Sequence, residues 1–269
     1  FFFIPAMGVK GIGIATIIAQ LVTLIIILIK VLKNSRVKEI TKEHLLPKFL
    51  FFKNIFFQSM PITVSICGYS IAAAIIFTYV GQSGEYATAG YGAGTRIEQV
   101  VLLPILGINT AIISIISQNY GAKNFNRIKE TYFIALKYAF IIMVTSGIIV
   151  FTSANIITSF FSSDPEVIEY GKRYLKISAF VLPAYPIFFL SNGFFMAIKK
   201  SEIAMISNFF RNVMNPILVF YIAKYISASF NTFFGIWVVI NWFFSMLYLM
   251  IVFYYLKSRL EKSSAVVHP

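Results

Sequence analysis

Seven long apolar runs constrain this chain more than any other feature. They cover residues 11–33, 55–80, 88–117, 132–153, 174–198, 203–226 and 233–256. A helix needs about 20 mainly apolar residues to cross a hydrocarbon core about 30 Å thick. A helix also satisfies its own backbone hydrogen bonds, as a segment in lipid must. We therefore predict an all-α polytopic membrane protein with seven transmembrane helices.

The composition supports this class and excludes a rival one. Hydrophobic residues make up 58% of the chain and charged residues 12%, and the mean hydropathy is +0.80. The net charge of +13 would also suit a nucleic-acid-binding protein. However, the basic residues lie in short loops between apolar runs, whereas a nucleic-acid footprint needs them on one soluble face. We expect membrane lipids as partners and no nucleic acid.

The distribution of Lys and Arg predicts the orientation in the membrane. Most of these residues lie within 30–53, 123–137, 199–200 and 257–262, and the loops between these segments carry fewer. Cytoplasmic loops are the ones enriched in Lys and Arg. We therefore expect a multi-pass protein whose C-terminus is cytoplasmic. Segment 34–54 is too polar to span the membrane and is predicted to be a linker along the inner surface, between two lobes.

Glu98 is the most informative polar residue because it lies inside the run 88–117. A carboxylate near the bilayer centre costs roughly 2.5 to 3.5 kcal/mol even on lenient insertion scales. At about 100° per residue, Glu98 and Asn109 share a helix face, whereas Arg96 points away from Glu98. Pro104 removes one backbone hydrogen bond between them and is expected to kink the helix. Glu98 and Asn109 are therefore candidates for Na⁺ binding or proton coupling, and an interhelical hydrogen bond is the structural alternative.

A polar stripe in the run 203–226 is the second candidate feature. Asn208, Arg211 and Asn215 lie within one arc of the predicted helix, directly before Pro216. They could line a central cavity, supply a counter-charge to Glu98, or bind a neighbouring helix. Further cavity-lining candidates lie on single faces of two other predicted helices, and these are Gln58, Tyr69, Tyr185 and Asn192.

The residues that support catalysis in other proteins are scarce. Cys67 is the single cysteine, and His44 and His268 fall in a loop and in the tail. The chain contains no HExxH pair and no pair of acids at catalytic spacing, which argues against a membrane-embedded enzyme. We expect no enzymatic activity, no cofactor and no structural metal site.

Three segments resemble the multidrug and toxic compound extrusion (MATE) family. They are GVKGIGIATIIAQ (8–20), YGAGTRIEQVVLLPILGINTAIISIISQNYGAKN (91–124) and FGIWVVINW (234–242), and the stretch from Arg211 to Pro216 is also similar. The resemblance implies twelve helices in two six-helix lobes of a bacterial inner-membrane protein. It also implies export of small organic cations, drugs or toxins in exchange for Na⁺ or H⁺.

By this resemblance the chain is a C-terminal part of such a transporter. Residues 1–33 would end the first lobe with helix 11–33, 34–54 would be the cytoplasmic interlobe linker, 55–256 the second lobe and 257–269 the cytoplasmic tail. The similar starts of helices 11–33 and 233–256, Gly13-Ile14-Ala15-Thr16 and Gly235-Ile236-Trp237-Val238, agree with two repeats. The missing N-terminal lobe would then be a partner that transport requires.

The chain departs from the family pattern in its acidic residues. Several members place a cation-binding Glu in helix seven and an Asp in helix ten, but 55–80 and 174–198 contain no such acid. The first-lobe acid that many members use for coupling would lie upstream of Phe1. Two alternatives stay open: a flippase for a lipid-linked saccharide of the same superfamily, and a membrane scaffold that transports nothing.

Overall fold

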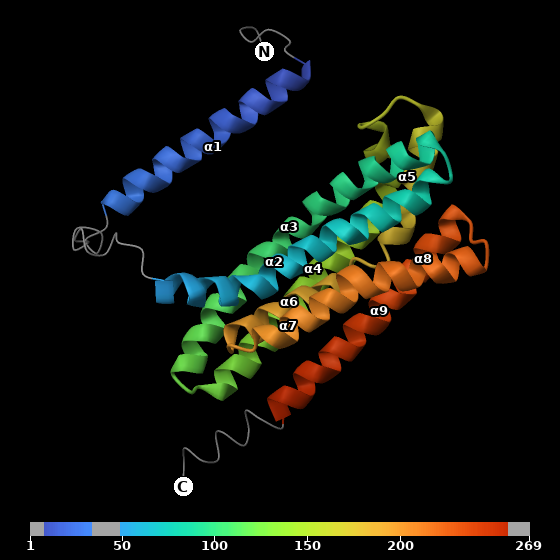
Figure 1. Ribbon diagram of the computed structural model, residues 1–269. Coiled ribbons are helices and arrows are strands. Elements are labelled where there is room, and N and C mark those ends of the chain that lie inside the picture. Colours follow the sequence, from blue (N-terminus) through green and yellow to red (C-terminus); the bar gives the residue numbers. More distant parts are fainter. Residues whose placement is uncertain (1–7, 34–48, 258–269) are drawn as a thin grey trace. The chain divides into compact units, whose positions relative to one another are not determined.

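Helices form all the regular structure in the part of the chain that the computed structural model describes, residues 8–33 and 49–257 (Figure 1). These elements are α1 (Gly8–Leu32), α2 (Phe49–Gly81), α3 (Glu85–Gly121), α4 (Phe125–Ser159), α5 (Pro165–Ser178), α6 (Ala184–Ala197), α7 (Ser201–Phe209), the π-helical segment η3 (Phe210–Met214), α8 (Asn215–Tyr225) and α9 (Phe230–Tyr255). His44 and His268 lie outside the described residues, as do most of the expected linker and most of the tail.

The predicted all-α polytopic fold is confirmed. Among the described residues, five helical stretches are long and apolar enough to cross a membrane: α1, α3, α4, the continuous stretch Ser201–Tyr225, and α9. Shorter apolar helices, Cys67–Gly81 within α2 and Ala184–Ala197 (α6), lie in the other two predicted spans. The observed helices extend beyond several predicted ends, and α2 begins at Phe49, within the expected linker.

Capping residues explain where several helices begin. The Asp164 side chain accepts hydrogen bonds from the backbone N–H groups of Glu166 (2.8 Å) and Val167, and Pro165 starts α5. Asn124 caps α4 and Ser229 caps α9 in the same way. Such side chains satisfy backbone donors that the first helical turn leaves unpaired. The prediction located helices by their apolar residues and did not include these polar first turns. The predicted starts of α4, α5 and α9 therefore lie after the observed ones.

The run 174–198 is not one continuous helix, contrary to the prediction. The chain leaves the α-helical conformation between Ser178 and Ala184, and Val181 N–H donates to the Ser178 carbonyl in a tighter turn. Pro183 has no N–H to donate to the Ala179 carbonyl, which accounts for the break. The freed Phe180 carbonyl accepts a hydrogen bond of 2.8 Å from Trp242 Nε1 in α9. Two half-helices, α5 and α6, therefore replace one span.

The run 203–226 is continuous but contains a π-helical segment. The Asn215 N–H donates to the Phe210 carbonyl, five residues earlier, and Pro216 follows directly. Because Pro216 carries no N–H, neither usual helical donor reaches the Arg211 carbonyl. Single π-helical turns widen a helix locally and are frequent at functional sites. Here the segment carries Arg211.

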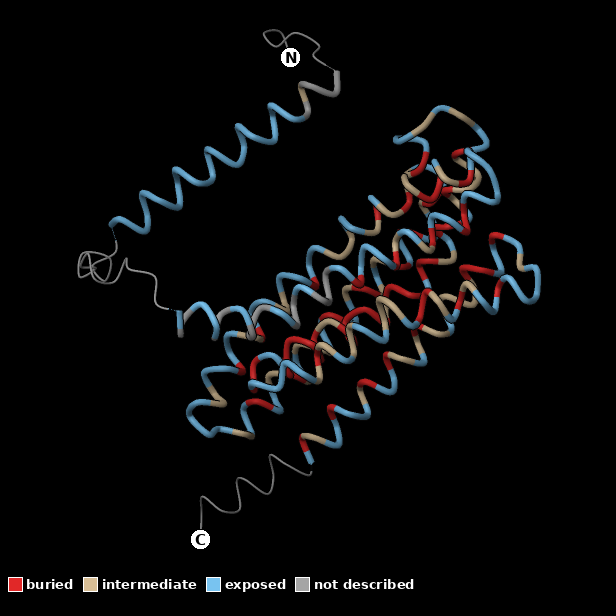
Figure 2. Tube along the Cα trace, viewed as in Figure 1, coloured by how far each residue is buried: buried red, intermediate tan, exposed pale blue. Residues whose placement is uncertain are grey.

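Helix α3 is the central element, in contact with α4, α5 and α6. Two glycines four residues apart, Gly90 and Gly94, let α5 approach closely. A Cβ at Gly90 would lie 2.7 Å from the backbone of α5, and one at Gly94 would lie 2.3 Å from the Tyr174 ring. This small-residue spacing is a common device for packing helices in membranes. Figure 2 shows buried residues on the facing sides of these helices and exposed residues on their outer sides.

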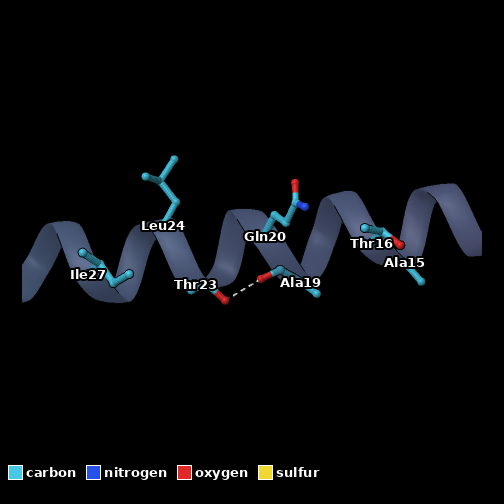
Figure 3. Close-up of a pocket in the computed structure, with 7 residues that line it drawn as sticks. All are labelled: Ala15, Thr16, Ala19, Gln20, Thr23, Leu24 and Ile27. Carbon is cyan, nitrogen blue, oxygen red and sulfur yellow. Dashed lines mark hydrogen bonds between the residues drawn. The ribbon is translucent and has the colours of Figure 1, made fainter. Parts of the chain in front are cut away.

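Helix α1 belongs to a separate compact unit, residues 1–57, and is described by itself. Its described side chains are almost all exposed (Figure 2). A shallow hollow along it is lined by Ala15, Thr16, Ala19, Gln20, Thr23, Leu24 and Ile27 (Figure 3). Only one helix forms this hollow, and Thr23 Oγ1 donates to its own helix at the Ala19 carbonyl, 2.8 Å away. The hollow is a helix face and not an enclosed site.

Candidate transport site

A cavity of about 500 Å³ lies among α2, α3, α5, α6, α9 and the α7–η3 stretch. Its wall contains Glu98 and Arg211, several aromatic rings, and the polar side chains of Asn208 and Asn212. Pockets of about 300 to 1,000 Å³ hold drug-sized ligands. The cavity therefore has the size and mixed polarity of a site for a small organic molecule.

Two tyrosine hydroxyls hold the Glu98 carboxylate in the cavity wall. Tyr174 donates to one carboxylate oxygen and Tyr185 donates to the other. Tyr174 belongs to α5 and Tyr185 to α6, so Glu98 of α3 contacts both halves of the broken span. Glu98 is half-buried, and both tyrosines are buried. The cost of placing a carboxylate here is thus offset by two hydrogen bonds to its oxygens.

Packing around Tyr174 fixes its hydroxyl toward Glu98. Gly94 lies one helical turn before Glu98 and leaves room for the Tyr174 ring, as described above. The ring also packs edge to face against Tyr91 and Phe234, with centroid distances of 4.9 Å in both cases. Aromatic pairs prefer this edge-to-face arrangement. Helices α3 and α9 together therefore position a tyrosine of α5.

Arg211 lies on a shelf of aromatic rings at the same cavity. Its guanidinium carbon is 4.2 Å from the ring centre of Phe188, 4.8 Å from that of Tyr185 and 5.4 Å from that of Phe189. Its Nε donates to Asn241 Oδ1 at 3.4 Å. Arg211 is close enough to attract Glu98 electrostatically, but the two residues form no direct ion pair in the structure. The counter-charge expected from the sequence is thus near Glu98, with Tyr185 between them.

The structure gathers several of the predicted residues at this cavity. Glu98, Tyr185, Arg211 and Asn208 all line it, and Tyr69 lines it from α2. Arg96 is exposed and does not line the cavity, as its predicted direction on the helix implied. Of Gln58, only the backbone is described, so its assignment as a cavity residue stays a prediction.

Three other candidates lie outside the cavity wall. Asn109 packs against α6, where a Cβ on Gly193 would lie 2.1 Å from its Oδ1. Asn192 is buried, and its Oδ1 accepts from Tyr248 at 3.0 Å and from Asn208 at 3.4 Å. Asn215 is fully buried, and its amide group has no hydrogen-bond partner among the residues that the structure describes. The structure therefore does not unite Asn109 with Glu98, because Pro104 and more than two helical turns separate them.

Sequence reasoning missed Tyr174 and the aromatic shelf. Tyr174 is the first residue of the predicted span 174–198, and it was not among the residues predicted to line a cavity. The Gly90 and Gly94 spacing was the available signal, because it marks where another helix approaches α3 just before Glu98. Phe188 and Phe189 had no such signal, since aromatic residues occur throughout the chain.

Among the described residues, no three His, Cys, Asp or Glu side chains lie close enough together to hold a metal ion. Glu98 is instead surrounded by hydroxyl groups and rings. A carboxylate in a cavity is chemically able to exchange a proton or to attract a monovalent cation.

Comparison with known proteins assigns the family. The profile of the MatE family matches residues 61–221, which include Glu98, both tyrosines and Arg211. The chain belongs to this family of multi-pass membrane transporters, whose members are not enzymes. The predicted resemblance to MATE proteins is thereby confirmed.

Individual relatives agree with this assignment. An FAD transporter of Shewanella oneidensis is 30% identical over 107 residues, 40% of this chain and 24% of that protein. The probable multidrug resistance protein NorM of Thermotoga maritima is 27% identical over 177 residues, 64% of this chain and 37% of that protein. The chain thus spans well under half the length of these two relatives.

Solved structures show the same fold. The inward-facing conformation of a multidrug resistance MATE family transporter has a TM-score of 0.75 and 21% identity, covering 84% of this chain and 52% of that one.

Proposed function

We propose that this chain is the C-terminal part of a cation-coupled efflux transporter. In this proposal residues 55–256 form the second lobe, helix 11–33 ends the first lobe, and 34–54 and 257–269 are the linker and tail on the cytoplasmic side of a bacterial inner membrane. Support comes from the family membership and from the partial coverage of longer relatives. Export would need both lobes, because alternating access moves one repeat against the other.

The observation that carries the coupling proposal is the pair of tyrosines on Glu98. An ionised carboxylate only accepts hydrogen bonds, and both oxygens here receive one. A protonated Glu98 would carry one O–H donor and could not accept equally from both hydroxyls. Proton uptake would therefore weaken the contact of α3 with α5 or with α6. Since the helix is interrupted between α5 and α6, the cavity wall could rearrange at this point.

This arrangement favours H⁺ over Na⁺ as the coupling ion. A proton converts an acceptor of Glu98 into a donor, and this changes the tyrosine contacts directly. A sodium ion would need several oxygen ligands beside the carboxylate, and Asn109, the amide oxygen expected to help, lies elsewhere. The exchange of one proton at Glu98 for one substrate molecule is thus the simplest cycle.

The substrate class is proposed to be small, flat organic compounds. The cavity is of drug-like size and contains aromatic rings such as Phe234 and Trp237. Two relatives are named for FAD and for multiple drugs. A lipid-linked saccharide would call for a wider cavity with more cationic groups than Arg211 alone.

Glu98→Gln in the full-length protein tests this function. We expect loss of at least about tenfold in proton-driven dye export from proteoliposomes, because the amide cannot release a proton and removes a charge-assisted hydrogen bond of roughly 1.5 to 3 kcal/mol. The measurement compares export driven by a pH gradient with export driven by a Na⁺ gradient. Glu85→Gln, at the exposed start of the same helix, is the matched control.

Two results would contradict the proposal. Normal export by Glu98→Gln would remove Glu98 from the coupling mechanism. Export that follows the Na⁺ gradient and ignores the pH gradient would keep the transporter but replace the proposed ion.

A further inference from the structure

Arg211 keeps most of its hydrogen-bonding capacity open toward the cavity. A guanidinium carries five N–H donors. Among the described residues it has acceptors in Asn241 Oδ1, which binds Nε, and in the Tyr185 hydroxyl oxygen. The Tyr185 hydroxyl donates its own proton to Glu98 and accepts a hydrogen bond from Arg211. Terminal N–H donors of the guanidinium therefore remain available to a ligand in the cavity that Arg211 lines.

The aromatic shelf holds the guanidinium without neutralising it. The faces of the Phe188, Tyr185 and Phe189 rings attract a cation and carry no charge that would neutralise it. The charge of Glu98 is engaged by two tyrosines and does not pair directly with Arg211. The cavity thus presents an oriented positive group whose planar fork matches a carboxylate or a phosphate.

Further aromatic side chains line the same cavity. Tyr91, Phe234 and Trp237 add ring surface, with Tyr91 and Phe234 stacked at 5.4 Å. A flat ligand could pack against these rings while an acidic group reaches Arg211. A purely cationic ligand would meet Arg211 as a like charge and would find both oxygens of Glu98 already bonded.

We propose that the cavity binds a flat aromatic compound bearing a carboxylate or phosphate, with Arg211 as its anchor. This inference rests on the proposed transport function and departs from the organic cation that the family resemblance implies. Glu98 serves coupling and Arg211 serves recognition. The two charges of the cavity therefore have separate tasks.

The test is equilibrium binding to the full-length protein, measured by probe fluorescence. Fluorescein and rhodamine 123 share a ring system but differ in charge, being anionic and cationic respectively, and they test the carboxylate. Riboflavin 5′-phosphate and riboflavin share a flavin ring and test the phosphate. We expect the acidic member of at least one pair to bind more tightly, and the pair that shows this identifies the acidic group.

Arg211→Met is expected to weaken binding of the preferred acidic probe by about tenfold to a hundredfold, the range for a lost hydrogen bond to a charged group. Binding of its non-acidic partner should change less than about threefold. Arg96→Met, an exposed position on α3 outside the cavity wall, is the matched control and should leave both affinities unchanged.

The proposal is overturned if rhodamine 123 and riboflavin bind at least as tightly as their acidic partners, or if Arg211→Met binds all probes like the wild type. Should Arg211→Met fail to fold, the proposal is tested by probe binding to Arg211→Lys and by the preference of the wild type for the acidic probes. Lysine keeps the charge but loses the planar fork, so we expect an intermediate loss. Binding needs no ion gradient, so failure of the Glu98 experiment and failure of this one are distinguishable.

Discussion

At the scale of single residues, the site depends on how one carboxylate is tolerated inside an apolar helix. Glu98 keeps both oxygens bonded by tyrosines from two other helices, and its neighbourhood includes a cation that it does not pair with directly. Burial of an unpaired charge would cost several kcal/mol. Tyr174 and Tyr185 therefore belong to the site together with Glu98, and Gly94 leaves room for the Tyr174 ring.

Gly94→Ala tests that positioning. A Cβ at this position would overlap the Tyr174 ring at 2.3 Å, so the ring must shift and its hydroxyl should leave Glu98. We expect proton-driven export by the full-length protein to fall by about tenfold, from the loss of one hydrogen bond to a charged group. The measurement is the initial rate of dye export in proteoliposomes.

Gly92→Ala is the matched control, because a Cβ at Gly92 would meet no atom within 4 Å. It should export like the wild type. Equal rates for Gly94→Ala and Gly92→Ala would show that the place of the Tyr174 ring does not matter to transport.

At the scale of helices, close packing around α3 decides the architecture. Glycines face α3 from α5 and α6, and α3 supplies glycines of its own. Helices in lipid gain little from the hydrophobic effect, so close backbone contact contributes much of their association. One close contact of α3 with α6 is that of Asn109 with Gly193.

Gly193→Ala is expected to destabilise the helix bundle by about 1 to 3 kcal/mol, the usual cost of overpacking. The added Cβ would lie 2.1 Å from Asn109 Oδ1. The measurement is the thermal unfolding of the full-length protein in detergent, compared with Gly107→Ala, whose Cβ would meet nothing within 4 Å.

The double variant Asn109→Ala with Gly193→Ala should recover most of this loss, because it removes the group that the new methyl meets. If the double variant is as unstable as Gly193→Ala alone, the destabilisation has another origin. A full recovery would show that the clash with Asn109 accounts for the loss of stability.

At the scale of the whole molecule, the distribution of Lys and Arg predicts the orientation in the membrane. The loops near residues 122–124 and 198–200 join α3 to α4 and α6 to α7, and they carry Lys123, Lys199 and Lys200. The loop 160–164 joins α4 to α5 and carries no Lys or Arg. The positive-inside rule predicts that the first two loops are cytoplasmic and that the third is outside.

Cysteine labelling tests this orientation. With Cys67 replaced by Ser in the full-length protein, a cysteine at Lys199 should react with a membrane-impermeant maleimide only after cells are opened. A cysteine at Ser162 should react in intact cells. The opposite pattern would invert the proposed topology, and the Cys67→Ser parent without added cysteines measures background labelling.

The sequence by itself determined the class of protein and the approximate place of the membrane spans, and it singled out Glu98 as a candidate site residue. These conclusions follow from local properties of the sequence. A membrane span needs an apolar run of a certain length, and a carboxylate within such a run costs free energy whatever its distant contacts are. It also placed Arg211 and Asn208 on one helix face, because helical periodicity is local too.

Only the tertiary structure decided which side chains meet. It joined Tyr174 and Tyr185 to Glu98 across a break in one predicted span, placed Arg211 on an aromatic shelf, and separated Asn109 from the cavity. The physical reason is that apolar and aromatic faces are abundant in a membrane chain and many pairings satisfy hydropathy equally well. Close contacts at a few glycines, and the hydrogen bonds that a buried carboxylate requires, select one pairing among them.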